Sequence, residues 1–270
     1  MSTEVLERAI REHDPSHVFA LFSGGHDSLC ATHIASKHPR FSGVIHVNTG
    51  IGVEATRTYV RETCARFGWP LKEYHVEGQS YRDLALTYGF PGPPQHNVMY
   101  RKLKQRSLER VVREHKTHRH DRLIFVNGAR RGESQRRMRT TAGKEVYREK
   151  CIVWVSVIHG WAATDRLPYM ALHGLPRNPV VDRLHMSGEC LCGCFSKPGE
   201  LQMLEAWYPE TAATIRDLER EVRARGLPCL WGEPPPTKVS PDQQSMPFWS
   251  ELEVVRPRRR MLCQDCVVPT

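Results

Sequence analysis

The sequence predicts an α/β protein built on a doubly wound parallel sheet, with a Cys-rich C-terminal extension. Three observations lead to this prediction. Short apolar runs alternate with amphipathic segments between residues 4 and 157, the order typical of strands and their crossover helices. A glycine-rich loop at residues 23–28 follows the first strand-like run and opens a helix. Five of the nine cysteines form two clusters in the last third of the chain.

The individual elements follow from the spacing of the apolar residues. The predicted strands are short apolar runs bounded by polar or glycine residues, and they cover residues 17–22, 42–48, 71–76, 122–126 and 151–157. The predicted helices show helical spacing of apolar residues, and they cover residues 4–13, 29–37, 54–67, 81–89, 99–116 and 200–225. Loops rich in proline and glycine are expected at residues 90–94 and 232–236.

The composition changes after about residue 179, where the alternation of strands and helices gives way to a charged helix and a basic tail. No second apolar core is evident there. We therefore expect a nucleotide-binding α/β domain at residues 1–199, followed by a helical and cysteine-bearing extension at residues 200–270 that packs against it.

The charge is unevenly distributed along the chain. The 39 Lys and Arg residues exceed the 30 Asp and Glu residues, and residues 101–150 alone hold 17 basic and 6 acidic side chains. Such a block suits nucleotide phosphates or a nucleic-acid backbone, although a solvated helix face is the alternative for residues 102–116. Because no apolar run is long enough for a membrane span and the first 14 residues are charged, a cytoplasmic protein is expected.

The loop Ser23-Gly24-Gly25-His26-Asp27-Ser28 has the composition of an anion cradle. Gly24 and Gly25 allow the backbone to approach a ligand closely, while Ser23 and Ser28 offer hydroxyl groups. The N–H groups at the start of the following helix point towards a bound anion. It is not a Walker A loop, because no Gly-Lys-Ser/Thr sequence follows.

This loop resembles the SGGxDS pyrophosphate loop (PP-loop) of the N-type ATP pyrophosphatases and the PAPS reductase family. Asn48-Thr49-Gly50 with Glu54 resembles the family's DTG-x-x-x-x-E segment, with Asn48 in place of the usual Asp. Residues 127–137 resemble its TG-x-R-x-x-ES-x-x-R block, and residues 161–179 its W-x-x-x-D to L-P-x-N-P stretch. The resemblance covers residues 18–200 and implies an adenine nucleotide alpha hydrolase-like fold.

The resemblance also implies roles for single residues. Arg130 would bridge phosphate oxygens, and Glu133 would either orient Arg130 or bind the nucleotide. Lys104 stands where the family often has a phosphate-binding lysine. Nucleotide-binding residues are expected at Ser23, Gly24, Gly25, Asp27, Ser28, Asn48, Thr49, Gly50, Gly128, Arg130, Glu133, Ser134 and Arg137, and catalytic residues at Asp27, Lys104, Arg130 and Cys190.

The clustered cysteines predict a metal site. One cluster has single residues between its cysteines, and the other has two residues between them. Two such segments, distant in the sequence, can together complete one set of ligands. The five thiols are those of Cys190, Cys192, Cys194, Cys263 and Cys266. Thiolate sets of this kind select zinc or an iron–sulfur cluster. The resemblance favours [4Fe–4S], with zinc and ordinary thiols as alternatives. Five candidates exceed four positions, so Cys190 is expected to be the substitute ligand or the catalytic thiol.

The resemblance implies an enzyme that binds ATP with Mg²⁺, adenylylates a substrate with release of pyrophosphate, and supports sulfur transfer through a cluster or a cysteine. The phosphorothioate-DNA-modification proteins are of this type. A PAPS or APS reductase is the first alternative, although Glu189-Cys190 matches only the start of the reductases' Glu-Cys-Gly-Leu-His signature. A nucleic-acid-binding protein with structural zinc is the second. The expected partners are an adenine nucleotide, DNA or RNA as sulfur acceptor, and a second copy of the chain in a homodimer; no membrane is expected.

Overall fold

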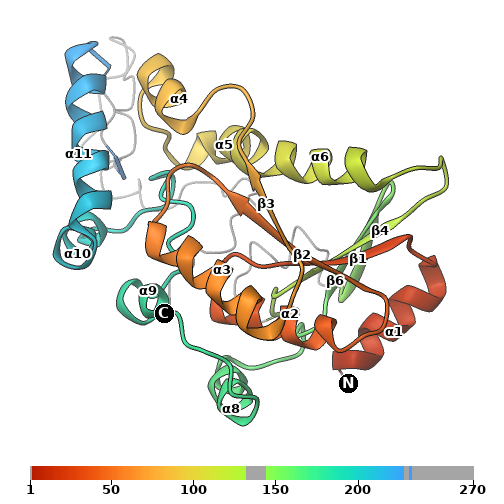
Figure 1. Cartoon of the computed structure of the whole chain (residues 1–270). Coiled ribbons are helices and arrows are strands. Elements are labelled where there is room, and N and C mark those ends of the chain that lie inside the picture. The colour runs from red at the N-terminus through yellow and green to blue at the C-terminus, as the bar shows by residue number, and fades with distance from the viewer. Residues whose placement is uncertain (1, 132–143, 228–230, 233–270) are drawn as a thin grey trace, which may run out of the picture.

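The computed structural model describes residues 2–131, 144–227 and 231–232. Its strands are β1 His17–Leu21, β2 Phe41–Asn48, β3 Leu71–His75, β4 Leu123–Asn127, β5 Val146–Glu149 and β6 Ile152–Ser156. Over these described ranges they form one six-stranded sheet in the order β3-β2-β1-β4-β6-β5 (Figure 1).

The sheet is doubly wound about β1, as predicted. β1 runs parallel to β2 on one side and to β4 on the other, with Val18 opposite Phe41 and Ile124. β3 continues the parallel sheet beyond β2, and β6 continues it beyond β4. The carboxyl ends of β1 and β4 therefore meet where the chain order reverses, which is the position at which open α/β sheets bind ligands.

An antiparallel edge strand was not predicted. β5 pairs antiparallel with β6, Val146 lying opposite Val155 and Glu149 opposite Ile152. Three of its four residues are exposed, so the strand lacks the apolar run that identified the other five. An exposed edge strand needs little apolar surface, because only one side of it pairs and packs.

Helices cover both faces of the sheet (Figure 1). On one face α1 Ser2–His13 and α2 His26–Ser36 share a core with Val18, Ala20 and Ile124. α3 Glu54–Phe67 and α8 Arg166–Leu172 pack beside α2. On the other face Leu108 and Val111 of α6 Arg106–His115 contact a core cluster with Phe19 and Phe125. The apolar side chains of neighbouring β1 residues thus point to opposite faces, as a strand requires.

The helix predicted at residues 99–116 is longer and irregular. It begins at α5 His96–Tyr100, passes through a π-helical turn at Arg101–Gln105 and continues as α6. Such turns are rare and frequently occur at functional sites.

The single helix predicted at residues 200–225 is wrong. The structure has two helices, α10 Glu200–Trp207 and α11 Pro209–Ala224, separated by Tyr208. Pro209 has no N–H for an intrahelical hydrogen bond, and its ring forces the preceding residue out of the helical region. Leu204 and Leu218 of these two helices nevertheless share a core with Tyr81 and Leu84 of α4 Tyr81–Tyr88.

The remaining described helices are α9 Pro179–Leu184 and two short 3-10 turns at Pro93–Gln95 and Ala163–Asp165. None of the helices in the described part of the chain has the length and apolar character needed to cross a bilayer.

Candidate nucleotide site

The predicted phosphate loop connects β1 to α2. Gly24 has a φ of +84°, and a Cβ atom there would lie 2.5 Å from Cγ2 of Thr56, so only glycine fits. The Ser28 hydroxyl donates to the Gly25 carbonyl at 2.8 Å and lies 3.2 Å from Oγ of Ser23. No side chain caps the N-terminus of α2 at Gly25. The first N–H groups of the helix therefore stay available for an anion.

Two arginines meet the carboxylate of this loop. Arg130 Nε lies 3.0 Å from Oδ1 of Asp27, and Arg166 Nη1 lies 3.4 Å from Oδ2. Arg130 follows β4, whereas Arg166 begins α8. Two guanidinium groups thus surround one carboxylate, which leaves a net positive charge beside the helix N-terminus. Arg166 was not predicted, and its position next to Asp165 in the sequence gives no signal of this contact.

Gly128 brings the loop after β4 against the phosphate loop. A Cβ atom at this position would lie 2.5 Å from the carbonyl carbon of Asp27 and 2.7 Å from the backbone nitrogen of Ser28. The preceding Asn127 fixes the turn, since its Oδ1 accepts the N–H of Ala129 at 2.9 Å and the Ser156 hydroxyl at 2.9 Å. The absence of a side chain at Gly128 is therefore what allows Arg130 to reach Asp27.

Asn178 and His26 fasten the other side of the loop. The Asn178 amide donates to the Gly24 carbonyl at 2.9 Å, and its backbone N–H donates to Nε2 of His26 at 3.2 Å. Burial lowers the pKa of His26, which agrees with a neutral ring that accepts at Nε2. This role of His26 was not predicted, because a partner 152 residues away cannot be read from spacing.

The segment Asn48-Thr49-Gly50 lies at the carboxyl end of β2. Asn48 uses both ends of its amide within the protein: Oδ1 accepts the Gly50 N–H at 3.0 Å, and Nδ2 donates to Oε1 of Glu73 at 3.0 Å. Glu73 in turn accepts two hydrogen bonds from Arg61, each 2.9 Å long. Arg61 lowers the pKa of Glu73 to about 2. The family has a carboxylate at position 48 itself, whereas here the carboxylate of Glu73 lies next to the Asn48 amide.

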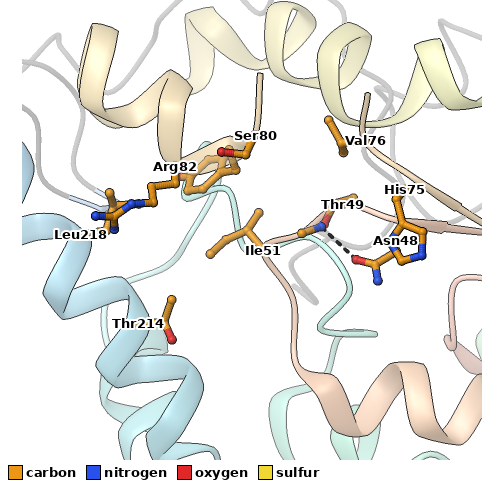
Figure 2. A pocket seen from close by; sticks show the side chains of 11 residues that line it. Asn48, Thr49, Ile51, His75, Val76, Ser80, Arg82, Thr214 and Leu218 are labelled. Atoms are coloured by element: carbon orange, nitrogen blue, oxygen red, sulfur yellow. Dashed lines mark hydrogen bonds between the residues drawn. The ribbon is translucent and has the colours of Figure 1, made fainter. Parts of the chain in front are cut away.

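A cavity of about 290 Å³ opens beside this segment (Figure 2). Its wall combines the ends of β2 and β3 with the start of α4 and one face of α11, and it is formed by residues 48–51, 75–76, 80–82, Thr214 and Leu218. Figure 2 shows Ser80 and Arg82 opposite Asn48 and His75, with Ile51 between them. The cavity is of a size that suits part of a nucleotide or a small substrate.

The first cysteine cluster is buried. Cys190, Cys192 and Cys194 are 8%, 3% and 1% exposed. Tyr81 donates to the Cys192 carbonyl at 2.9 Å, and Trp231 donates to the Leu191 carbonyl at 2.7 Å. A second, very small cavity is lined by Cys190, Cys192, Lys104 and His96 together with neighbouring side chains. The structure thus places two predicted catalytic residues, Lys104 and Cys190, at one cavity.

The predicted metal site is only partly within the described residues. Over residues 2–131, 144–227 and 231–232, no group of three or more His, Cys, Asp or Glu side chains is arranged to hold a metal ion. Cys263 and Cys266 lie outside these residues, as do Glu133, Ser134 and Arg137 of the predicted nucleotide site. The described cysteines alone supply soft, buried donors but no complete ligand set.

These features define a doubly wound α/β protein with a glycine-rich loop at its topological switch point. The family model of the phosphoadenosine phosphosulfate reductase domain matches residues 17–199, and the chain belongs to this family. Membership supports a nucleotide-using enzyme of sulfur chemistry. Among curated proteins, no sequence matches this chain.

This chain is similar to several solved structures, as follows. The phosphoadenylyl-sulfate (PAPS) reductase from Candida auris, solved as a phosphate complex, has a TM-score of 0.50 and 19% identity, covering 67% of this chain and 83% of that one. The U34-tRNA thiolase NcsA from Methanococcus maripaludis, with its [4Fe–4S] cluster, has a TM-score of 0.47 and 17% identity, covering 82% and 78%. The FMN adenylyltransferase from Candida glabrata, with FAD and inorganic pyrophosphate, has a TM-score of 0.47 and 10% identity, covering 68% and 59%.

Proposed function

We propose that this protein is an enzyme that binds ATP as its Mg²⁺ complex, adenylylates an acceptor with release of pyrophosphate, and supports transfer of sulfur to the activated acceptor. The observation that carries the proposal is the closed phosphate loop, in which Gly24 and Gly128 leave room for close backbone approach and Arg130 and Arg166 converge on Asp27. An uncapped helix N-terminus together with two arginines suits a polyphosphate better than a single carboxylate ligand.

In the proposed reaction an acceptor oxygen attacks the α-phosphorus of ATP, and the bond to the β-phosphate oxygen breaks. Negative charge grows on the leaving pyrophosphate, where Arg130, Arg166 and the N–H groups of α2 would neutralise it. Mg²⁺ would enter with ATP and share this charge. Asp27 holds both arginines in place, so that its catalytic role is to orient cations around the phosphates.

The adenosine end of the nucleotide would extend from the phosphate loop towards Thr49 and Gly50. The cavity of about 290 Å³ at the end of β2 includes both residues. Asn48 contributes to the wall, but its amide is already engaged by Gly50 and Glu73. Backbone groups of this segment, rather than a carboxylate at position 48, are therefore proposed to recognise the nucleoside.

Sulfur transfer is the second half of the proposal: sulfide-level sulfur from a donor would form the new bond to the activated acceptor, and the bond to AMP would break with AMP as the leaving group. The thiols that would take part are those of Cys190, Cys192 and Cys194, with Cys263 and Cys266 as further ligands of a [4Fe–4S] cluster or, as the alternative, of zinc. The support is chemical, since buried thiolates suit either metal. The basic segment at residues 101–150 supports DNA or RNA as the acceptor. A cytoplasmic location and a homodimer remain part of the proposal.

Reduction of PAPS or APS to sulfite is the alternative favoured by the family description. In that reaction Cys190 would attack the sulfate sulfur. Leu191 and Cys192 follow Cys190 where the reductase signature has Gly-Leu, which weighs against this alternative. A nucleic-acid-binding protein with structural zinc has weaker support, because such a function would not need Gly24, Gly128 and Arg130 to close a phosphate loop.

The test is calorimetric titration of anaerobically purified protein with ATP–Mg²⁺, APS and PAPS. We expect tight binding of ATP–Mg²⁺, weaker binding of the other two nucleotides, and loss of affinity in Arg130→Ala. Arg8→Ala is the control, because Arg8 is an exposed arginine of α1 whose ion pair with Glu145 includes no residue of the loop. Preference for PAPS or APS would replace the proposal with the reductase, and failure of all three nucleotides to bind would refute both.

A further inference from the structure

The segment at residues 188–191 is joined to residues 49–53, which follow β2, by hydrogen bonds of both backbone and side chains. Glu189 is 1% exposed, and its Oε1 accepts the Thr49 N–H at 2.9 Å. Its backbone carbonyl accepts the Thr49 hydroxyl at 2.6 Å. On either side, the Val53 N–H donates to Gly188 at 2.8 Å and the Leu191 N–H donates to Ile51 at 2.7 Å. The two segments therefore run side by side with little room to shift.

The other carboxylate oxygen of Glu189 faces the His46 ring and the Arg57 guanidinium group. Oε2 lies 3.3 Å from Nε2 of His46 and 3.6 Å from Nε of Arg57. Neither Glu189 Oε2 nor His46 Nε2 has a hydrogen-bond partner among the residues that the structure describes. The contact thus depends on charge rather than on directed hydrogen bonds, and removal of the charge alone would disturb it.

His46 extends this contact to the phosphate loop. It is fully buried, and its Nδ1 lies 2.7 Å from the carbonyl of Phe22, the residue that precedes Ser23. A carbonyl only accepts, so Nδ1 carries a proton. Burial lowers the pKa of His46, but Glu189 and the Phe22 carbonyl outweigh this effect, and the net pKa is raised. A protonated ring would donate to the loop and face the carboxylate at the same time.

We propose that Glu189 is a positioning residue that holds the Cys190 segment, the Thr49 turn and the start of the phosphate loop in register. The inference rests on the proposed function, because it assigns Glu189 to the same nucleotide and cysteine machinery. A buried charged group is costly unless it is paired, and a well-packed apolar residue would serve stability as well. What the carboxylate adds is a fixed orientation of three segments that are distant in the sequence.

The test uses Glu189→Gln, which keeps an acceptor for the Thr49 N–H and removes the charge. Glu219→Gln is the matched control: Glu219 is 7% exposed, accepts the Trp231 N–H at 3.2 Å, and lies on α11. We expect Glu189→Gln to weaken ATP–Mg²⁺ binding roughly ten-fold, as for the loss of one charge-assisted interaction, and the control to leave it unchanged. Equal effects of the two variants would refute the positioning role.

A double-mutant cycle separates positioning from general destabilisation. His46→Asn keeps an amide donor for the Phe22 carbonyl and loses the contact with Glu189. If the two residues act through one contact, the double variant binds ATP–Mg²⁺ about as weakly as the weaker single variant. If the loss of affinity in the double variant equals the product of the losses in the two single variants, the residues act independently and the proposal is overturned. Should Glu189→Gln fail to fold, His46→Asn alone must still produce the loss.

Cysteine alkylation supplies a readout that needs no nucleotide. We expect Cys190 to react roughly ten-fold faster in Glu189→Gln than in the natural protein, while Cys64 stays protected. Cys64 is 1% exposed and burial raises its pKa to about 12, so it reports global unfolding. An unchanged rate at Cys190, or an equal increase at Cys64, would contradict the proposal. If the natural protein binds no nucleotide, the proposed function fails, and the alkylation rates still decide the role of Glu189.

Discussion

Arg130 Nε lies 3.0 Å from Oδ1 of Asp27, although 103 residues separate the two side chains. The contact is possible because β1 and β4 are neighbours in the sheet, so that the loops after them leave the same edge. The phosphate loop is therefore closed by an ion pair between two crossover units, and each unit constrains the other.

Loss of the Arg130 guanidinium should weaken phosphate binding. Arg130→Ala removes a buried cation, and Ser28→Ala removes a hydroxyl at the helix N-terminus. Each is expected to reduce the binding free energy of ATP–Mg²⁺ by about 1–3 kcal/mol, the range for a hydrogen bond to a charged group. Calorimetric titration of each variant with ATP–Mg²⁺, with Arg8→Ala as the control, measures this difference in binding free energy. Unchanged affinity in both variants would show that the nucleotide binds elsewhere.

Arg166 should make a smaller and more salt-sensitive contribution. Its side chain is 29% exposed, against 9% for Arg130, and its contact with Asp27 is longer. Exposed ion pairs are screened by salt more strongly than buried ones. We expect the affinity gap between Arg166→Ala and the natural protein to shrink between low and high salt, whereas the gap for Arg130→Ala persists. The same salt dependence in both variants would argue against this ranking.

Aspartate at position 48 should be destabilising here. Asn48 donates to Glu73, and a carboxylate at the same position would face a second carboxylate instead. Asn48→Asp is expected to lower the free energy of unfolding by roughly 1–3 kcal/mol at neutral pH, since a donor to the half-buried carboxylate of Glu73 is lost. The loss should be smaller in a Glu73→Gln background, as urea unfolding of the four proteins would show. An equal loss in both backgrounds would rule out the pair as its cause.

The contacts of Glu73 with Asn48 and Arg61 also make the free energy of unfolding depend on pH. The pKa of Glu73 falls from its usual value of 4.5 to about 2 in the folded protein, chiefly through Arg61. Because the folded pKa is the lower one, the unfolded state takes up protons first as the pH falls. The stabilisation is complete above about pH 5 and is lost between about pH 4.5 and pH 2. The stability difference between the natural protein and Glu73→Gln should shrink over that window and stay constant above it.

Metal content tests the cysteine assignment. Cys192→Ser and Cys266→Ser are each expected to reduce bound iron or zinc in anaerobically purified protein, because each removes one predicted ligand. Cys151→Ser is the control, since Cys151 precedes β6 at the edge of the sheet opposite the phosphate loop. Metal analysis and the absorption spectrum distinguish a cluster from zinc. Unaltered metal content in Cys192→Ser would remove Cys192 from the ligand set.

The parallel strands and the place of the glycine-rich loop could be predicted because both depend on local sequence. The parallel strands β1, β2, β4 and β6 are buried over most of their length, so they stand out in the sequence as apolar runs. The Gly-Gly pair of the loop predicts a left-handed backbone conformation, and Gly24 adopts one. β5 was missed because it is exposed. The break at Pro209 was missed because apolar spacing continues across it, from Leu201 and Leu204 to Ala212 and Ile215.

The contacts of Arg166 and Glu189 could not be predicted, since their partners lie in remote parts of the chain. Arg166 meets Asp27 across 139 residues, and Glu189 meets Thr49 across 140. Neither residue has a local pattern that distinguishes it from a surface charge. Sheet order brings them together, and sheet order is not encoded in the spacing of any one segment.

The π turn at Arg101–Gln105 has a consequence for how this chain tolerates change in length. Its i→i+5 bonding accommodates one residue more than an α-helical turn. Met99 and Leu103 before its end, and Leu108 and Val111 after it, are all buried. Deleting one residue inside this turn would therefore regularise the helix and leave its two halves in nearly the same rotational phase. A single codon lost at residues 101–105 would thus keep both apolar faces on the core, whereas the same loss within the regular part of α6 would rotate the rest of the helix by about 100°.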